Sequence, residues 1–252
     1  MMDQKPIALI TGASSGIGVA TARLLAPSHR LIICGRRVER LTQLAKELAS
    51  ATSVIQLDFD VRDQKAVAEK IASLPEDWQN IEVLVNNAGN AHGLDPFHEA
   101  SVADWDAMID INVKGLLYVS KAITPGMVTR ARGHIINIGS IAGIEVYPNG
   151  HVYCASKFAV GAITQGMRQD LNPFNIRVTE IRPGLVETEF SEVRFKGDTE
   201  RASQVYQGYE PLTAKDVADT VRYAVLAPAH VTIADLTILP TAQASATIVK
   251  KQ

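Results

Sequence analysis

The chain has 252 residues, enough for one large α/β domain, and an ordinary composition of 46% hydrophobic and 21% charged residues. Its net charge of −2 provides no electrostatic basis for binding nucleic acid or an anionic membrane surface, and no stretch reaches the ~18 apolar residues of a membrane span. Two cysteines, Cys34 and Cys154, exclude a disulfide scaffold, and the polar start MMDQKP has no feature of a secretory signal. We therefore expect a cytoplasmic protein that binds neither nucleic acid nor a membrane.

The first half of the chain alternates between strand and helix. The short apolar run 7–11 is typical of a strand buried on both faces, and helical spacing follows over 16–26, where Pro27 ends it. The same alternation predicts strand 30–35, helix 37–50, strand 53–59, helix 63–74 and strand 81–89.

The second half continues this alternation. A long helix is predicted over 101–130, broken at Pro125 and Gly126 because proline removes a helical hydrogen bond. The pattern then predicts strand 134–140, helix 152–171, strand 176–184, helix 213–226 and strand 231–239. Together these elements predict an α/β fold: a single doubly wound Rossmann-type domain over 1–252, with a seven-stranded parallel sheet and helices on both faces.

Segment 185–212 is the least regular part of the chain. It follows the carboxyl end of a predicted strand, which is where ligands bind in open α/β sheets. We interpret it as a substrate lid; an ordinary surface excursion is the alternative.

The turn TGASSGIG lies between the first strand and the first helix and predicts a phosphate-binding site. Its glycines let the backbone turn tightly and approach a pyrophosphate, and the helix N-terminus offers free N–H groups. The residues assigned to this site are Gly12, Ser14, Ser15, Gly16, Ile17 and Gly18. A glycine-rich turn at this place in an alternating α/β chain indicates dinucleotide binding.

The end of the second strand favours NADP over NAD. An acidic residue there binds the ribose 2′-hydroxyl of NAD, whereas arginine accommodates the 2′-phosphate of NADP. The chain has Arg36 and Arg37 at this point and no acid before Glu39. Because a guanidinium grips phosphate with a planar fork, we predict NADP(H) with both arginines on the phosphate; the alternative for one of them is a solvated position at the helix start.

Tyr153 and Lys157 are four residues apart in HVYCASKFAV, a spacing that places both side chains on one face of a helix. A phenol titrates near ~10 in water, and a nearby ammonium favours its ionised form, so we expect Lys157 to lower the pKa of Tyr153. The pair can then act as a general acid/base on a substrate oxygen near neutral pH. Ser140, upstream in NIGSIAG, can polarise the same oxygen.

These residues together resemble the short-chain dehydrogenase/reductase family, and the resemblance covers nearly the whole chain. It rests on TGASSGIG, LDFDVRD, NNAG at 86–89, INVKG around Asn112, the Ser140, Tyr153 and Lys157 set, and RPGLVET at 182–188. The resemblance implies an NADP(H)-dependent oxidoreductase with a catalytic tetrad of Asn112, Ser140, Tyr153 and Lys157. It also implies a homotetramer.

The resemblance gives each tetrad residue a role. Tyr153 would exchange a proton with the substrate oxygen, Lys157 would bind the nicotinamide ribose, and Ser140 would hold the substrate oxygen. Asn112 would fix a water that links Lys157 to solvent; a surface amide is the alternative, since asparagine is an indifferent helix former. The further cofactor contacts that it implies are Asp60, Val61, Asn87, Ala88, Gly89, Tyr153, Lys157, Pro183, Gly184, Val186 and Thr188.

The C-terminal half narrows the resemblance. GLVETEF, VRFKGD and ADLTILPTAQAS are similar to the NADP-dependent 3-hydroxy acid dehydrogenases, which oxidise L-serine, L-allo-threonine or 3-hydroxypropionate, or reduce semialdehydes such as malonic semialdehyde. A broad carbonyl reductase for neutral ketones and aldehydes is one alternative. A dinucleotide-binding regulator without catalysis is the other, since a fold does not imply a function.

A 3-hydroxy acid needs a cation for its carboxylate, and the fork of an arginine matches a carboxylate. Arg194, in the predicted lid, is the candidate, and Arg182 is the weaker alternative; a solvated lid residue is the competing interpretation of Arg194. Tyr147 and His151 are candidates for the pocket wall beside Ser140 and Tyr153. The histidines show no metal-ligand spacing, and we expect no metal.

Overall fold

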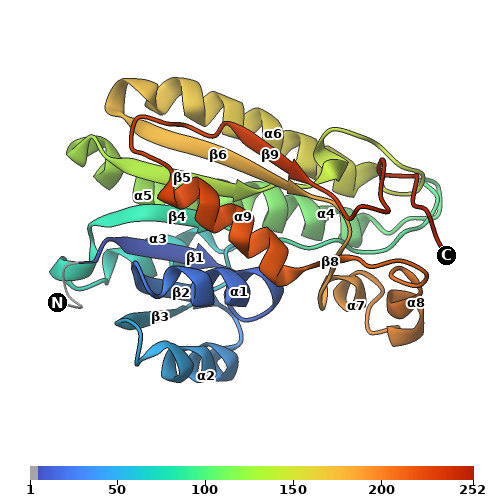
Figure 1. The fold of residues 1–252 in the computed structure, drawn as a ribbon, viewed down its shortest axis with the longest axis horizontal. Helices are drawn as coiled ribbons and strands as arrows, with labels where there is room; N and C mark the ends of the chain where they lie inside the picture. Colours follow the sequence, from blue (N-terminus) through green and yellow to red (C-terminus); the bar gives the residue numbers. More distant parts are fainter. Residues whose placement is uncertain (1–4) are drawn as a thin grey trace.

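The computed structural model describes residues 5–252 and confirms a seven-stranded parallel sheet with helices on both faces (Figure 1). The strand order is β3-β2-β1-β4-β5-β6-β9, so the order reverses between β1 and β4. Ligands bind at such a switch point, beyond the carboxyl ends of the strands. The strands are β1 (Ile7–Thr11), β2 (Arg30–Gly35), β3 (Val54–Asp58), β4 (Ile81–Asn86), β5 (Gly133–Ile138), β6 (Ile176–Pro183) and β9 (Asp235–Ile238).

Two helical layers cover the sheet. On one face lie α1 (Gly16–Leu25), α2 (Val38–Leu48) and α9 (Ala214–Leu226); on the other lie α3 (Gln64–Ala72), α5 (Leu116–Arg130) and α6 (His151–Leu171) (Figure 1). Residues of β1 alternate between these layers: Ile7 and Leu9 face the core beside α3 and α5, and Ala8 and Ile10 face the core beside α1 and α9. Burial on both faces explains the unbroken apolar run of this strand.

The predicted break at Pro125 and Gly126 is wrong. Helix α5 continues through both residues, because Ile123 and Met127 on either side are buried in the core and their packing holds the helix. The irregularity lies earlier instead, where the π-helical segment η3 (Asp110–Gly115) joins α4 (Val102–Ile109) to α5. Such π-helical turns occur frequently at functional sites.

Segment 185–212, called the lid segment below, contains short regular elements that the sequence did not predict. They are β7 (Val186–Glu187), α7 (Phe190–Arg194), α8 (Thr199–Gln204) and β8 (Leu212–Thr213). Strands β7 and β8 pair in parallel, so both ends of the segment lie side by side. In Figure 1 the two helices stand beyond one end of the sheet, where β6 ends. No helix within residues 5–252 has the length and apolar character to cross a membrane.

Candidate active site

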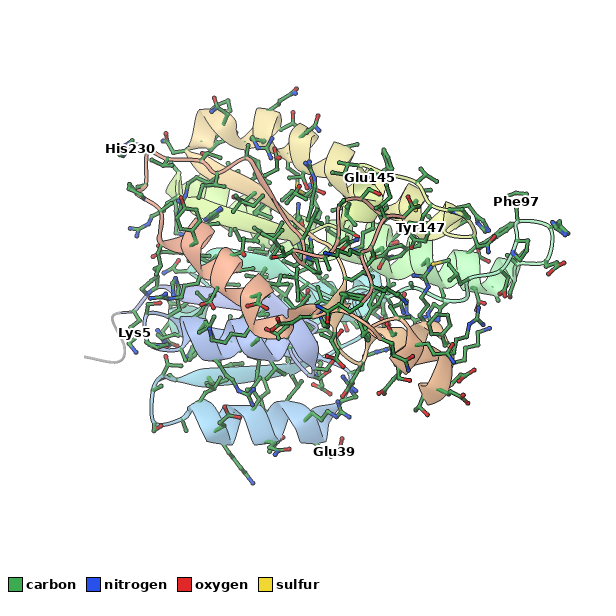
Figure 2. All side chains as sticks on the ribbon, turned by 45° about the vertical axis from the view of Figure 1, so that its right-hand side comes forward. Lys5, Glu39, Phe97, Glu145, Tyr147 and His230 are labelled. Atoms are coloured by element: carbon green, nitrogen blue, oxygen red, sulfur yellow. The ribbon has the colours of Figure 1, made fainter. Side chains whose placement is uncertain are left out.

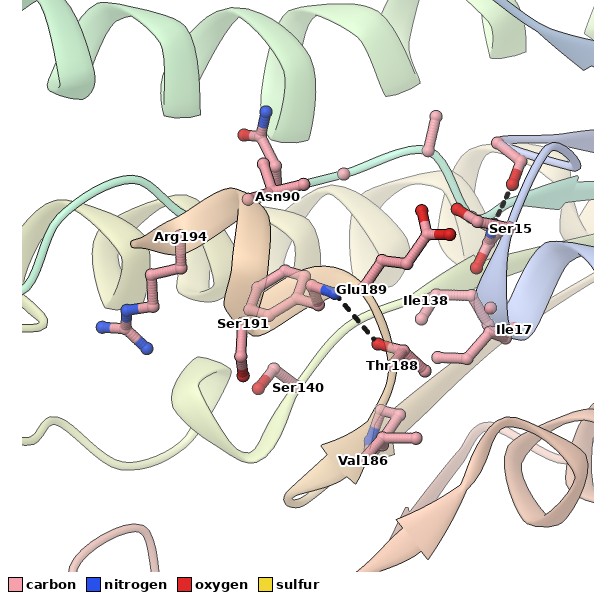
Figure 3. Close-up of a pocket in the computed structure, with 18 of the residues that line it drawn as sticks. Ser15, Ile17, Asn90, Ile138, Ser140, Val186, Thr188, Glu189, Ser191 and Arg194 are labelled. Carbon is pink, nitrogen blue, oxygen red and sulfur yellow. Dashed lines mark hydrogen bonds between the residues drawn. The ribbon is translucent and has the colours of Figure 1, made fainter. Parts of the chain in front are cut away.

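A cavity of about 510 Å³ lies between the phosphate turn, the ends of the central strands, α6 and the lid segment (Figure 3). Tyr147, on its wall, and Lys5, just before β1, lie on opposite sides of the molecule in Figure 2, as expected for a site at the carboxyl ends of the strands. The predicted residues that line the cavity are Gly12, Ser14, Ser15, Gly16, Ile17, Arg36, Arg37, Asp60, Val61, Asn87, Ala88, Gly89, Ser140, Tyr147, Tyr153, Lys157, Pro183, Gly184, Val186, Thr188 and Arg194. Gly18 and Asn112 lie outside this lining, as do the pocket candidates Arg182 and His151.

The phosphate turn needs its glycines for two different reasons. Gly12 and Gly16 have φ angles of 66° and 49°, a region that glycine enters without strain. A Cβ added to Gly12 would also lie 2.8 Å from Asn87 Nδ2. Gly18 instead lets α1 pack closely, since a Cβ there would collide with the Gly12 carbonyl oxygen. Gly18 therefore shapes the turn from behind the cavity wall.

The three central polar groups come from two neighbouring elements. Tyr153 and Lys157 lie one turn apart on α6, and Ser140 lies two residues after the end of β5. All three are buried, with exposed fractions of 9%, 6% and 9%. The Lys157 ammonium donates to the Ile138 carbonyl oxygen at 2.9 Å and lies 5.9 Å from the centroid of the Tyr153 ring.

Burial dominates the ionisation of both groups. It raises the pKa of the Tyr153 phenol, and Tyr147 adds to the rise, whereas the hydrogen bond to Ser140 and the charge of Arg194 oppose it. The net shift of the Tyr153 pKa is therefore upward, opposite to the expected lowering, because loss of hydration outweighs the charge of Arg194 and the hydrogen bond to Ser140. Burial lowers the pKa of Lys157 to about 8, opposed by the charge of Glu180.

Asn112 is no surface amide, since it is 2% exposed within η3. Its Oδ1 accepts from the Asn90 backbone N–H at 2.9 Å, and its Nδ2 donates to the Asn90 carbonyl at 2.8 Å and to Ser156 Oγ at 3.0 Å. Gly89 leaves room for it, as a Cβ there would lie 2.9 Å from Asn112 Oδ1. Asn112 thus joins η3 to the loop after β4 and to the residue that precedes Lys157.

Arg194 extends from α7 towards the same end of the cavity. Its Nε donates to the Gly93 carbonyl oxygen at 3.1 Å, and its guanidinium carbon lies 5.6 Å from the Tyr147 ring centroid and 5.7 Å from that of Tyr153. Figure 3 shows Arg194 and Ser140 on the part of the cavity away from Ser15 and Ile17. A cation therefore borders the Tyr153 end of the cavity.

Two other candidates do not reach this cavity. Arg182 is paired with Glu180 at 2.7 Å and with Asp235 at 3.1 Å, so its charge is already neutralised. His151 lies edge-on to Trp105, with ring centroids 5.5 Å apart, in an aromatic cluster outside the cavity lining. The predicted pocket role of His151 is not supported by this placement.

The cavity wall includes residues that the sequence analysis missed: Asn90, Glu189, Phe190, Tyr206 and Gln243. Phe190 meets the Tyr153 ring at a centroid distance of 5.8 Å, and Gln243 Oε1 accepts from the Leu185 backbone N–H at 2.9 Å. Glu189 and Phe190 follow directly after RPGLVET, so that motif could have drawn attention to them. Gln243 follows the last strand, and only the fold brings it to the cavity.

A family model for short chain dehydrogenases matches residues 6–199. The chain belongs to the short-chain dehydrogenase/reductase family. It is 49% identical over 242 residues to the NADP-dependent 3-hydroxy acid dehydrogenase YdfG of Escherichia coli strain K12, a match that covers 95% of this chain and 97% of that protein. It is 46% identical over 240 residues to sulfoacetaldehyde reductase 2 of Chromohalobacter salexigens, covering 94% and 95% of the two chains.

Solved structures agree with this membership. The closed form of a serine dehydrogenase complexed with NADP⁺ matches with a TM-score of 0.92 and 48% identity, covering 98% of this chain and 100% of that chain. A serine dehydrogenase from Escherichia coli matches with a TM-score of 0.82 and 43% identity, covering 94% and 99%.

Proposed function

We propose that this protein is an NADP(H)-dependent oxidoreductase for small 3-hydroxy acids such as L-serine, L-allo-threonine and 3-hydroxypropionate, or for the matching semialdehydes such as malonic semialdehyde. The observation that carries the proposal is the position of Arg194 beside Tyr153 and Tyr147, where it forms no ion pair with a carboxylate of residues 5–252. In a 3-hydroxy acid the carboxylate lies close to the reacting carbinol. A carboxylate on Arg194 therefore brings that carbinol towards Tyr153.

The cofactor is NADP(H), and the residues of the cavity fit it. Gly12 and the N-terminus of α1 at Gly16 line the cavity, which is where a pyrophosphate binds, and two arginines follow β2 where a 2′-phosphate is recognised. Relatives named as NADP-dependent support this choice. Bound NADP(H) supplies or accepts the hydride. Val186 and Thr188, which also line the cavity, would hold the nicotinamide carboxamide.

The side chains then divide the proton chemistry. With its pKa raised by burial, Tyr153 is a neutral phenol at physiological pH and donates its proton to the substrate oxygen during reduction. In the oxidative direction the phenolate form of Tyr153 takes the proton from the substrate hydroxyl, while Ser140 holds the oxygen by a hydrogen bond. Lys157 keeps its charge at neutral pH and would bind the nicotinamide ribose. The water that Asn112 would fix beside Lys157 stays a prediction.

Tyr153→Phe removes the proton donor and leaves the ring in place. We expect turnover to fall by about 100- to 10,000-fold, the usual worth of a general acid, with NADPH binding retained. Steady-state kinetics and a fluorescence titration with NADPH measure the two effects separately. Normal turnover in this variant would contradict the role of Tyr153 as the proton donor.

Arg194→Ala tests the substrate class. Loss of a charge-assisted hydrogen bond should raise KM for L-serine by about 10- to 100-fold, with a far smaller effect on 2-propanol. Lys196→Ala is the matched control, because Lys196 is a nearby cation that pairs with Asp104 at 2.9 Å and lies outside the cavity lining. The assay follows NADPH formation from each alcohol, repeated with NAD⁺.

Two competing functions make different predictions in this assay. A broad carbonyl reductase would oxidise 2-propanol with or without Arg194. A regulator would bind NADPH tightly without turnover, although the buried Tyr153 and Lys157 argue for catalysis. Because the fork of Arg194 matches a sulfonate as well as a carboxylate, sulfoacetaldehyde belongs among the substrates tested. The homotetramer and the cytoplasmic location stay predictions, which sedimentation and cell fractionation would test.

A further inference from the structure

Three charged side chains connect the start of the lid segment to the cofactor end of the cavity. Glu189, which directly precedes α7, accepts from Arg37 at 2.8 Å through Oε2 and from Arg40 through Oε1. Arg40 lies on α2, one turn after Arg37. Both carboxylate oxygens of Glu189 are therefore held by guanidinium groups from the segment that follows β2.

The same guanidinium of Arg37 also holds the phosphate turn. Its Nε donates to Ser14 Oγ at 3.2 Å, and its second terminal nitrogen donates to the Ser14 carbonyl oxygen at 3.3 Å. Thr188, the neighbour of Glu189, packs on the turn too, since a Cβ on Gly16 would lie 3.3 Å from Thr188 Cγ2. Figure 3 shows Glu189 and Thr188 on the same side of the cavity as Ser15. Arg37 thus joins the turn to the lid segment.

Arg36 is placed differently. Its side chain is 59% exposed, and its only carboxylate contact within the described residues is Asp60, at 3.5 Å. Asp60 is itself held more closely by Arg62, which approaches to 2.7 Å. Arg36 also lines the cavity, so its donors are available to an anion there. A planar guanidinium in this position matches a phosphate.

We propose that Glu189 is a latch that holds the lid segment over bound NADP(H) through Arg37 and Arg40, while Arg36 recognises the 2′-phosphate. The inference rests on the cofactor site proposed above. The latch slows dissociation of the dinucleotide whether or not a 2′-phosphate is present. Discrimination between NADP(H) and NAD(H) depends on Arg36, because the donors of Arg37 are engaged by Ser14 and Glu189.

Glu189→Gln tests the latch. We expect NADPH and NADH each to dissociate roughly two- to fivefold faster, the worth of partly exposed ion pairs, in stopped-flow fluorescence. Affinity for adenosine 2′,5′-bisphosphate, which carries the 2′-phosphate without the nicotinamide, should not change. Glu187→Gln is the matched control, because this substitution removes the same charge from an exposed position on β7 that lies outside the cavity lining.

Two further variants distinguish the role of Arg36 from that of Arg37. Arg37→Gln should repeat the faster dissociation of Glu189→Gln, and the double variant should add nothing, as expected for one coupled interaction. Arg36→Gln should weaken adenosine 2′,5′-bisphosphate by about tenfold and leave AMP binding and NADH dissociation unchanged. The three side chains changed, Glu189, Arg37 and Arg36, are at least partly exposed, so the variants should fold, and a melting curve for each checks this.

Each contrary result has a distinct meaning. Unchanged dissociation in Glu189→Gln overturns the latch, and tighter bisphosphate binding in that variant overturns it by making Glu189 a competitor of the phosphate. An equal loss of bisphosphate affinity in the Arg36 and Arg37 variants overturns the division between them. If neither arginine affects bisphosphate binding, the proposed cofactor site itself is wrong.

Discussion

At the scale of single residues, the buried ammonium of Lys157 destabilises the folded protein in order to serve the site. Its pKa is lowered to about 8 by burial, so the charged form is disfavoured in the folded chain relative to the unfolded one. Catalytic groups often carry such perturbed ionisation, since the site needs a charge where the core would exclude one.

Lys157→Met should therefore stabilise the protein while it abolishes turnover. We expect the free energy of unfolding at pH 7 to rise by about 2 kcal/mol, less than the shift in pKa implies because the bond to Ile138 is lost. The gain should be complete below the folded pKa and vanish as pH approaches the unfolded value of 10.5, where the unfolded chain also loses its proton. Urea unfolding at several pH values measures it; equal or lower stability at pH 7 would contradict this account.

At the scale of elements, η3 is the least regular helical segment and is held by Asn112. The side-chain amide of Asn112 forms hydrogen bonds to Asn90 and Ser156, and these bonds satisfy polar groups that have little access to water. Irregular backbone of this kind persists only where neighbouring groups over-determine it. Asn112 thus ties the segment to α6 and to the loop after β4.

Asn112→Ala should loosen this attachment. Leaving the Asn90 backbone N–H and C=O without partners, and the Ser156 hydroxyl without its donor, should lower the free energy of unfolding by about 1–3 kcal/mol and reduce kcat. Lys114→Ala, in the same segment, removes an exposed pair with Asp110 and should change stability by less than about 0.5 kcal/mol. Chemical denaturation of both variants checks the contrast, and similar losses would deny Asn112 a special role.

Elements with strong local signals could be predicted from the sequence. The seven strands follow from apolar runs, and the phosphate turn follows from three glycines whose spacing reflects backbone needs. The helix break predicted at Pro125 was wrong because core packing on both sides of it outweighs one missing hydrogen bond. The ionisation of Tyr153 could not be predicted, since burial depends on the whole fold. Gln243 and Tyr206 were missed because tertiary folding alone brings them to the cavity.

At the scale of the whole molecule, two buried histidines should make stability depend on pH. Burial lowers the pKa of His29 to about 4 and that of His134 to about 3. Both are neutral in the folded protein, whereas the unfolded chain takes up protons below its ordinary value of 6.5. Stability therefore falls as pH drops from 6.5 towards these lowered values.

Between pH 7 and pH 5 each histidine should remove about 2 kcal/mol from the free energy of unfolding. His134→Gln should abolish its share of this loss, so that urea unfolding of the variant depends less steeply on pH. His98, exposed beside Glu99, provides the control substitution His98→Gln, which should leave the slope unchanged. An equally steep slope in the His134 variant would contradict the argument.

The pairing of β7 with β8 has a consequence for engineering. Because Val186 lies opposite Leu212, the lid segment begins and ends in two paired strands that form a small sheet of their own, whatever lies between them. The segment is thus a cassette that can be transplanted between relatives with two neighbouring junctions and no change to the sheet. Transplanting the segment would transfer the preference for an acidic substrate, because Arg194 lies within it. The choice of dinucleotide would not be transferred, because Arg36 lies outside it.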